Sequence, residues 1–180
     1  DDFPASIYLD DYEERMTQLK SYPYEVRALR AYFHFNLLKR YNRIVIADRT
    51  YTPEEVNQLQ PATYDQAVEW IVDECNDIAP HLLVNYSNTP SAEMGRVTRG
   101  FVLALKARVL LYAASPLNNP VNSVSKWMDA AIAARDVIEL GEYDLIAEEV
   151  TNNENAAGLI FGKRNTSSNA FEKENFPIGI

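Results

Sequence analysis

The chain of 180 residues is acidic and otherwise ordinary in composition, which excludes several classes of protein at once. It is 47% hydrophobic and 24% charged, as expected for one folded domain and not for a disordered or low-complexity chain. With 17 Lys and Arg against 26 Asp and Glu, its formal charge of -9 repels phosphate backbones, so nucleic acid is not an expected partner. No apolar run reaches the ~20 residues needed to cross a bilayer.

Helical periodicity starts near the N-terminus and predicts a first helix over residues 10–20, which Tyr22-Pro23 closes. A second helix is predicted over 24–41. It has two apolar faces, one with Val26, Leu29, Phe33, Leu37 and Tyr41 and the other with Ala28, Tyr32 and Phe35, so it is expected to pack on two sides. The cations Lys39, Arg40 and Arg43 in its last turn are interpreted as complements of the helix dipole, in preference to a phosphate site.

The third helix is predicted over 64–79. Thr63 and Gln66 form a capping-box pattern at its start, and an apolar stripe follows on one face. Cys75 lies on that stripe. A buried, unpaired thiol acts as a small hydrophobe with a raised pKa, so no nucleophilic role is expected for it.

The last two predicted helices span 98–115 and 124–140. The earlier one is apolar on nearly every face and is therefore expected to be central, with Thr98 at its start and Ser115-Pro116 at its end. Gly141 is a stop signal for the later one. Residues 143–180 are predicted to be irregular around one short candidate strand, Leu159-Ile160-Phe161, and to pack on sequence that is absent here. The fold class is mainly α, of the tetratricopeptide-like helical-repeat type.

Three segments, in this order, resemble one known family. They are EVRALRAYFHFNLLKRY at 25–41, GRVTRGF with ALKARVLLY between 95 and 112, and WMDAAIAARDVI at 127–138, followed by Gly141 and Tyr143-Asp144-Leu145. Their order and spacing are similar to motifs of the SusD/RagB family of outer-membrane nutrient-binding lipoproteins. The resemblance covers about residues 10–165. It departs after Tyr41, where the family usually has a Gly and a Pro, and at Gly100-Phe101, where two Ala residues are usual.

The resemblance implies a SusD-like α-α superhelix, with 1–180 as a single domain from the helical half of a longer protein. The first residues, which carry no initiator Met or targeting signal, fit an internal piece. The family implies a non-catalytic protein that is lipid-anchored at the surface of a Gram-negative outer membrane, through an anchor outside this fragment. Its implied partners are a SusC-like TonB-dependent transporter and an oligosaccharide, or alternatively a peptide.

The residues themselves give no sign of catalysis. His34 and His81 lack partners at zinc-ligand spacing, and there is no nucleophile elbow or phosphate-binding glycine loop, so neither a catalytic site nor a metal or cofactor is expected. Acidic pairs such as Asp73 with Asp77 are interpreted as solvated helix faces. Two alternatives stay open: an intracellular α-helical scaffold for protein interactions and, with less support, a glycosidase.

Sugar binding needs exposed rings and planar polar groups. Most aromatic residues lie on helix stripes and are predicted to be core, among them Tyr32, Phe33, Trp70, Phe101, Tyr112 and Trp127. Loop aromatics are Tyr51, Tyr86 and Phe171, and loop amides include Asn118, Asn119 and Asn122. From composition alone, the ligand-binding candidates are Asn85, Tyr86 and Asn88.

Overall fold

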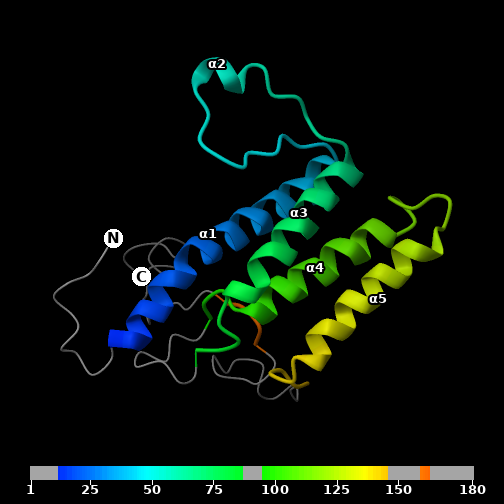
Figure 1. Cartoon of the computed structure of the whole chain (residues 1–180). Coiled ribbons are helices and arrows are strands. Elements are labelled where there is room, and N and C mark those ends of the chain that lie inside the picture. Colours follow the sequence, from blue (N-terminus) through cyan, green and yellow to red (C-terminus); the bar gives the residue numbers. More distant parts are fainter. Residues whose placement is uncertain (1–11, 87–94, 146–158, 163–180) are drawn as a thin grey trace, which may run out of the picture.

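The computed structural model describes residues 12–86, 95–145 and 159–162. Its elements are α1 (Tyr12–Tyr41), α2 (Pro53–Val56), α3 (Tyr64–Ile78), the 3-10 turn η1 (Ala79–His81), α4 (Arg99–Ala114) and α5 (Val124–Glu139) (Figure 1). Within these ranges the only β pairing is an isolated antiparallel bridge between Ile44 and Ala62. The predicted mainly α fold is confirmed.

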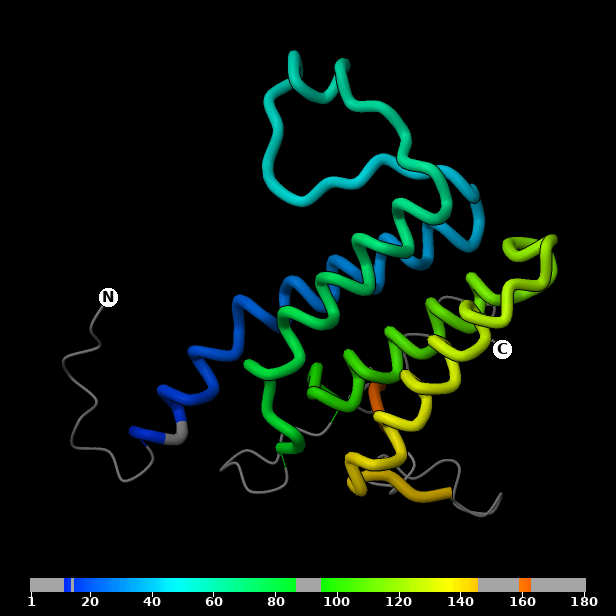
Figure 2. The backbone as a smooth tube through the Cα atoms, turned by 45° about the vertical axis from the view of Figure 1, so that its right-hand side comes forward, coloured from blue at the N-terminus to red at the C-terminus, as the bar shows by residue number. Residues whose placement is uncertain are grey.

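The four long helices lie side by side in the order of the chain. Helix α1 packs on α3, α3 on α4, and α4 most extensively on α5, while α4 also contacts α1 and η1. Both views show the segment between α1 and α3, which carries α2, extending away from the end of this row (Figures 1 and 2). The central position expected for the most apolar helix is thus confirmed for α4.

Small side chains form the contact between α1 and its neighbours. Ala28, Ala31 and Ala67 are completely buried, and larger side chains fill the space around them. The larger core members include Phe35, Leu38, Ile71, Ile78, Val102 and Val109. Alanines at these positions let the helix backbones approach closely, which is why the apolar stripes interlock.

Helix α1 is continuous, so the predicted break at Tyr22-Pro23 is wrong. A proline inside a helix loses one backbone hydrogen bond and costs about 3 kcal/mol. Buried side-chain interactions on both sides offset this cost: the Ser21 hydroxyl lies 2.7 Å from the carbonyl oxygen of Gln18 and 2.8 Å from Oε1 of Glu25. Glu25 also pairs with Arg96 from the segment before α4, at 2.7 Å, and this tertiary contact helps to override the local stop signal.

The predicted starts of α3 and α4 are confirmed, because Thr63 and Gln66 form a reciprocal capping box and Thr98 accepts from the backbone N–H of Phe101. The start predicted at residue 24 is wrong, since α1 is continuous there, and the start predicted at residue 10 lies outside the described residues. The predicted stop at Gly141 is also confirmed, with a left-handed φ of 69°. A second capping box, Thr52 with Glu55, opens the short helix α2, which the periodicity did not predict.

The candidate strand at Leu159-Ile160-Phe161 is wrong, since the described residues 159–162 form no strand. Their apolar side chains find a different partner: the ring centroid of Phe161 lies 4.4 Å from that of Phe101. Here the irregular segment packs on the chain's own core. Packing of the remainder of 143–180 on absent sequence stays a prediction.

The predicted aromatic core is correct only in part. Phe101 is buried, and Tyr32 and Trp70 pack against the core. Phe33, in contrast, is 60% exposed, and Tyr112 and Trp127 are each 39% exposed, so their assignment to the core is wrong in this chain. Phe33 is exposed because α1 buries only the face with Ala28 and Phe35, so its other apolar face is uncovered among the described residues.

None of the helices described is both long and apolar enough to pass through a membrane.

Gly100, in the first turn of α4, makes room for the ring of Tyr143. A Cβ built on Gly100 would lie only 2.6 Å from Cζ of that ring, whose hydroxyl is 3.0 Å from Oγ1 of Thr98. The absence of a side chain at position 100 therefore allows the segment after α5 to lie against the start of α4.

We predict that Gly100→Ala lowers the free energy of unfolding by about 1–2 kcal/mol, because the new methyl group collides with the ring. In a Tyr143→Ala background the same change should raise stability by about 0.5–1 kcal/mol, since alanine is the better helix former. Chemical denaturation of the four proteins of this cycle measures both effects. An identical effect in the two backgrounds would contradict the proposed contact.

Candidate functional site

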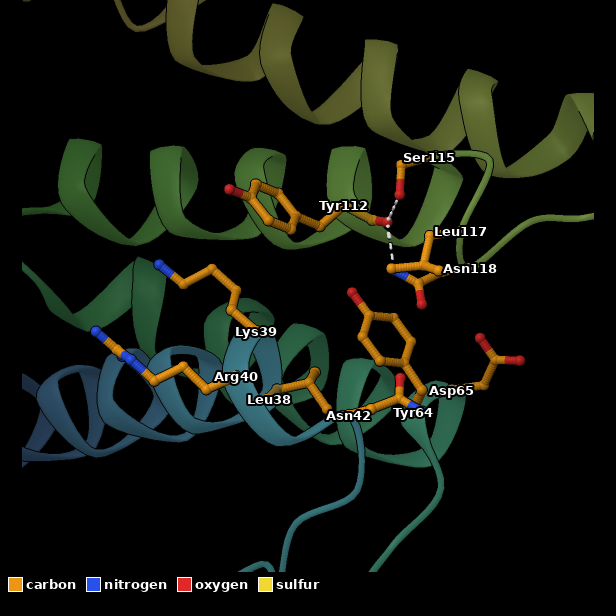
Figure 3. Close-up of a pocket in the computed structure, with 10 residues that line it drawn as sticks. All are labelled: Leu38, Lys39, Arg40, Asn42, Tyr64, Asp65, Tyr112, Ser115, Leu117 and Asn118. Atoms are coloured by element: carbon orange, nitrogen blue, oxygen red, sulfur yellow. Dashed lines mark hydrogen bonds between the residues drawn. The ribbon is translucent and has the colours of Figure 1, made fainter.

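A cavity of about 580 Å³ lies where the C-terminal ends of α1 and α4 meet the start of α3. Its walls come from residues 38–42, from Tyr64 and Asp65, and from the end of α4 with the following turn, residues 112–118 (Figure 3). The volume is within the range of about 300–1,000 Å³ that small-ligand sites have in proteins.

Two tyrosines form the aromatic part of the wall. Tyr112 meets Phe35 edge to face at 5.4 Å between ring centroids, and more than a third of its surface is exposed. Tyr64 is half-buried, and its hydroxyl oxygen has no hydrogen-bond partner among the described residues. Burial, together with the charge of Asp65, raises the pKa of Tyr64, so its phenol is neutral and able to donate at physiological pH.

The polar part of the wall carries two cations. Nζ of Lys39 lies 4.9 Å from the ring centroid of Phe35, and Nη1 of Arg40 donates to the carbonyl oxygen of Asn36 at 3.1 Å. Asp65, also on the wall, is instead paired with Lys126 at 2.8 Å and points away from the two cations (Figure 3). Asn118 donates to the carbonyl oxygen of Tyr112 at 3.0 Å, which orients its amide at the rim.

The residues selected from composition lie elsewhere. Tyr86 is only 2% exposed, and its hydroxyl donates to Oε1 of Glu25 at 2.7 Å. Tyr86 lies in a loop, as expected, but it is not an exposed ring on which a sugar could stack. Asn85 is exposed and donates to Oε2 of Glu142 at 2.6 Å, while Asn88 lies outside the described residues. A ligand-binding role for Asn85 and Asn88 stays a prediction.

Other loop residues divide between structural positions and the surface. Asn119 is buried and caps backbone groups of Ala114 and Ser123, and Asn122 accepts from Nε1 of Trp127 at 3.1 Å. Tyr51 is hydrogen-bonded to Asp48 and stacked with Arg49, on the segment that carries α2. Phe171 lies outside the described residues.

Tyr86 belongs to a buried cluster that joins α1 to the segment before α4. Arg96 donates to Glu25 through Nη2 at 2.7 Å and through Nε at 3.2 Å, a bidentate pair. Its guanidinium lies 4.8 Å from the ring centroid of Tyr22 and 4.6 Å from that of Tyr86. Because both charged groups are largely buried, this cluster is a structural link.

The remaining chemically active side chains also have structural surroundings. Cys75 is 1% exposed, and burial raises the pKa of its thiol to about 12. Asp77 pairs with Arg27 at 2.6 Å, so the acidic pair of Asp73 and Asp77 does not form an isolated catalytic dyad. Among the residues that the structure describes, no group of three or more potential ligands could hold a metal ion.

The cavity could not be predicted from the sequence, because each of its residues has a local explanation. Lys39 and Arg40 fit the helix dipole, Tyr112 fitted an apolar stripe, and Tyr64 directly follows the N-cap Thr63. One available signal was that neither cation has an acidic residue three or four positions away on its helix.

No family model and no curated protein matches the sequence, so solved structures supply the comparison. The chain is similar to a SusD-like protein from Bacteroides fragilis, with 25% identity and a TM-score of 0.68 over 84% of this chain and 28% of that one. It is also similar to a SusD homolog from Bacteroides thetaiotaomicron, with 26% identity and a TM-score of 0.59 over 73% and 24% of the two chains. The chain has the fold of SusD-like proteins, which supports a fragment of that family.

A third SusD-like structure, a carbohydrate binding protein from Bacteroides fragilis, shares the fold. It has 23% identity and a TM-score of 0.65, over 81% of this chain and 27% of that one. The chain thus spans little more than a quarter of the length of these two proteins from Bacteroides fragilis. The resemblance seen in the three sequence segments is confirmed at the level of the fold.

The cluster around Glu25 predicts a large loss of stability when one charge is removed. Arg96→Met should lower the free energy of unfolding by about 3 kcal/mol, because the carboxylate is then buried without its partner. The double variant Glu25→Gln/Arg96→Met should recover part of this loss. Arg135→Met, which removes the exposed pair with Glu139, is the control and should cost about 0.5 kcal/mol or less. Equal losses for Arg96→Met and Arg135→Met, in chemical denaturation, would contradict the analysis.

The surroundings of Cys75 predict an inert thiol in the folded protein. With a pKa of about 12, the thiolate is a minor species at pH 8, and the side chain is also inaccessible. A colorimetric thiol reagent at pH 8 should therefore react about 100-fold or more slowly with the native protein than with protein unfolded in denaturant. Comparable rates in the two states would show that the thiol is accessible and reactive.

Proposed function

We propose that the chain is part of a non-catalytic, cell-surface nutrient-binding protein that holds an oligosaccharide and delivers it to a SusC-like, TonB-dependent transporter. The observation that carries this proposal is the structural similarity to SusD-like proteins, one of which is called a carbohydrate binding protein. In this proposal the chain, 1–180, is one domain of a longer protein, which a lipid anchor outside this chain attaches to the outer membrane.

The cavity at the end of α1 supports a binding role. It combines the ring of Tyr112 and the amide of Asn118, groups that suit the apolar face and the hydroxyls of a sugar. Its acidic residue, Asp65, is paired with Lys126, so the wall offers no pair of carboxylates arranged for glycoside hydrolysis. Binding without turnover is therefore the activity that these residues support best.

The proposal predicts saturable binding of at least one oligosaccharide to the full-length protein, measured by isothermal titration calorimetry against a panel of plant and host glycans. Chromatography of the same mixtures after prolonged incubation should show intact glycan. Appearance of shorter products, lost on substitution of an acidic residue, would instead support a glycosidase. Absence of binding across the whole panel would contradict the proposal.

A matched pair of variants locates the binding site. Tyr112→Ala should weaken binding about tenfold, or by about 1.4 kcal/mol, because a ring on the cavity wall is lost. Phe33→Ala removes a similarly exposed ring on α1 outside the cavity and should leave the affinity unchanged. The opposite result would place the glycan on the uncovered face of α1.

A further inference from the structure

We propose that the cavity between α1, α3 and α4 selects oligosaccharides that carry an anionic group, either a carboxylate or a sulfate. This inference rests on the proposed glycan-binding function and specifies its substrate class. It depends on the charge of the cavity wall, which is opposite to the charge of the chain as a whole.

Two cations on the wall have no acidic partner. Lys39 and Arg40 form no ion pair with any carboxylate in the described part of the chain, although acidic residues outnumber basic ones by 26 to 17. Arg27, Arg49 and Arg96, in contrast, are each within 3 Å of a carboxylate oxygen. Other described cations, such as Arg43 and Arg99, also form no ion pair, and what distinguishes Lys39 and Arg40 is their place side by side on a cavity wall. The positive charge on the cavity wall is therefore available to a ligand.

The acidic residue of the wall does not neutralise these cations. Asp65 is held by Lys126 from α5, at 2.8 Å, and its carboxylate points away from Lys39 and Arg40 (Figure 3). The Lys126–Asp65 pair thus keeps this carboxylate turned away from the two cations. Local charge on the side of α1 is +2, from one lysine and one arginine.

The helix dipole explains why cations occupy the last turn of α1, but it does not explain the rest of the wall. Cationic side chains that extend into water interact equally well with the negative end of a helix dipole. Lys39 instead lies against Phe35, whose ring meets Tyr112 at 5.4 Å, so ammonium group and aromatic wall are continuous. This combination of a ring and a nearby cation suits a sugar unit that bears a negative group.

The chemistry of the two cations suits carboxylate and sulfate alike. Charge-assisted hydrogen bonds to such oxygens are shorter and about twice as strong as neutral ones, and a guanidinium can bind them with two parallel donors. A neutral sugar would displace water from Lys39 and Arg40 without offering them charge-assisted hydrogen bonds in its place. An anionic oligosaccharide should therefore bind more tightly than a neutral one of the same length and linkage.

Isothermal titration of the full-length protein with three tetrasaccharides tests the proposal. The probes are α-1,4-tetragalacturonate, the same tetramer with its carboxyl groups reduced to alcohols, and a sulfated galactose tetramer. We expect at least one anionic probe to bind at least tenfold more tightly than the reduced tetramer, and this advantage to shrink between 50 mM and 500 mM NaCl. Comparison of the two anionic probes identifies which group is preferred.

Matched variants assign the preference to the cavity. Lys39→Met keeps the alkyl contact with Phe35, and combined with Arg40→Gln it should remove the tenfold advantage while circular dichroism and the melting temperature stay close to the wild type. Arg135→Gln removes a positive charge from the exposed surface of α5, outside the cavity, and should preserve the tighter binding of the anionic probe.

The outcomes separate this inference from the proposed function. Equal or tighter binding of the reduced tetramer would overturn the anionic preference and leave glycan binding standing. An anionic preference that survives in the Lys39→Met/Arg40→Gln variant would overturn the assignment to this cavity. Absence of binding by these tetramers and by the wider glycan panel would overturn the proposed function itself.

Discussion

The close approach of α1 to α3 is the constraint on which the other features of the molecule depend. Ala28 and Ala31 on α1 and Ala67 on α3 are completely buried, and such small side chains let the helix backbones approach closely, so the two helices cannot separate without opening the core. The same approach brings the end of α1 beside the start of α3, where Tyr64 lies. The cavity is thus a direct consequence of how two alanine-lined helices pack, with α4 supplying the third wall.

Buried charge pairs then fix the alignment of the helices. Glu74 on α3 accepts from Arg27 and from Arg30 of α1, at 2.8 and 3.1 Å, and the pair of Arg96 with Glu25 joins α1 to the segment before α4. Although burial acts to raise the pKa of Glu74, the hydrogen bonds from the two arginines hold it below its ordinary value. The carboxylate is therefore charged at neutral pH, and the stability it contributes is lost only as pH falls through that lowered pKa.

Helix positions could be predicted from the sequence where the signal is local. The capping box at Thr63, the cap at Thr98 and the stop at Gly141 each depend on residues within a single turn. The continuity of α1 through Pro23 could not be predicted, because it depends on Glu25 meeting Arg96, a residue 71 positions away. The exposure of Phe33 and Trp127 could not be predicted from the sequence either, because periodicity shows that a helix face is apolar but does not identify which element covers it.

The site was harder to predict than the fold because its residues come from three helix ends that only packing brings together. Lys39, Tyr64 and Tyr112 each have an ordinary position in their own helix, and their place on the wall of one cavity is a property of the α1, α3 and α4 arrangement. The aromatic composition of the loops indicated Tyr86 as a ligand-binding residue. The hydroxyl of a loop tyrosine can, however, bind an acceptor inside the protein as readily as one on a ligand, and the hydroxyl of Tyr86 donates to Glu25. Charge is the more informative signal in an acidic chain: a lysine and an arginine that lie together on one cavity wall, without an ion pair to a described carboxylate, place positive charge where a ligand can reach it.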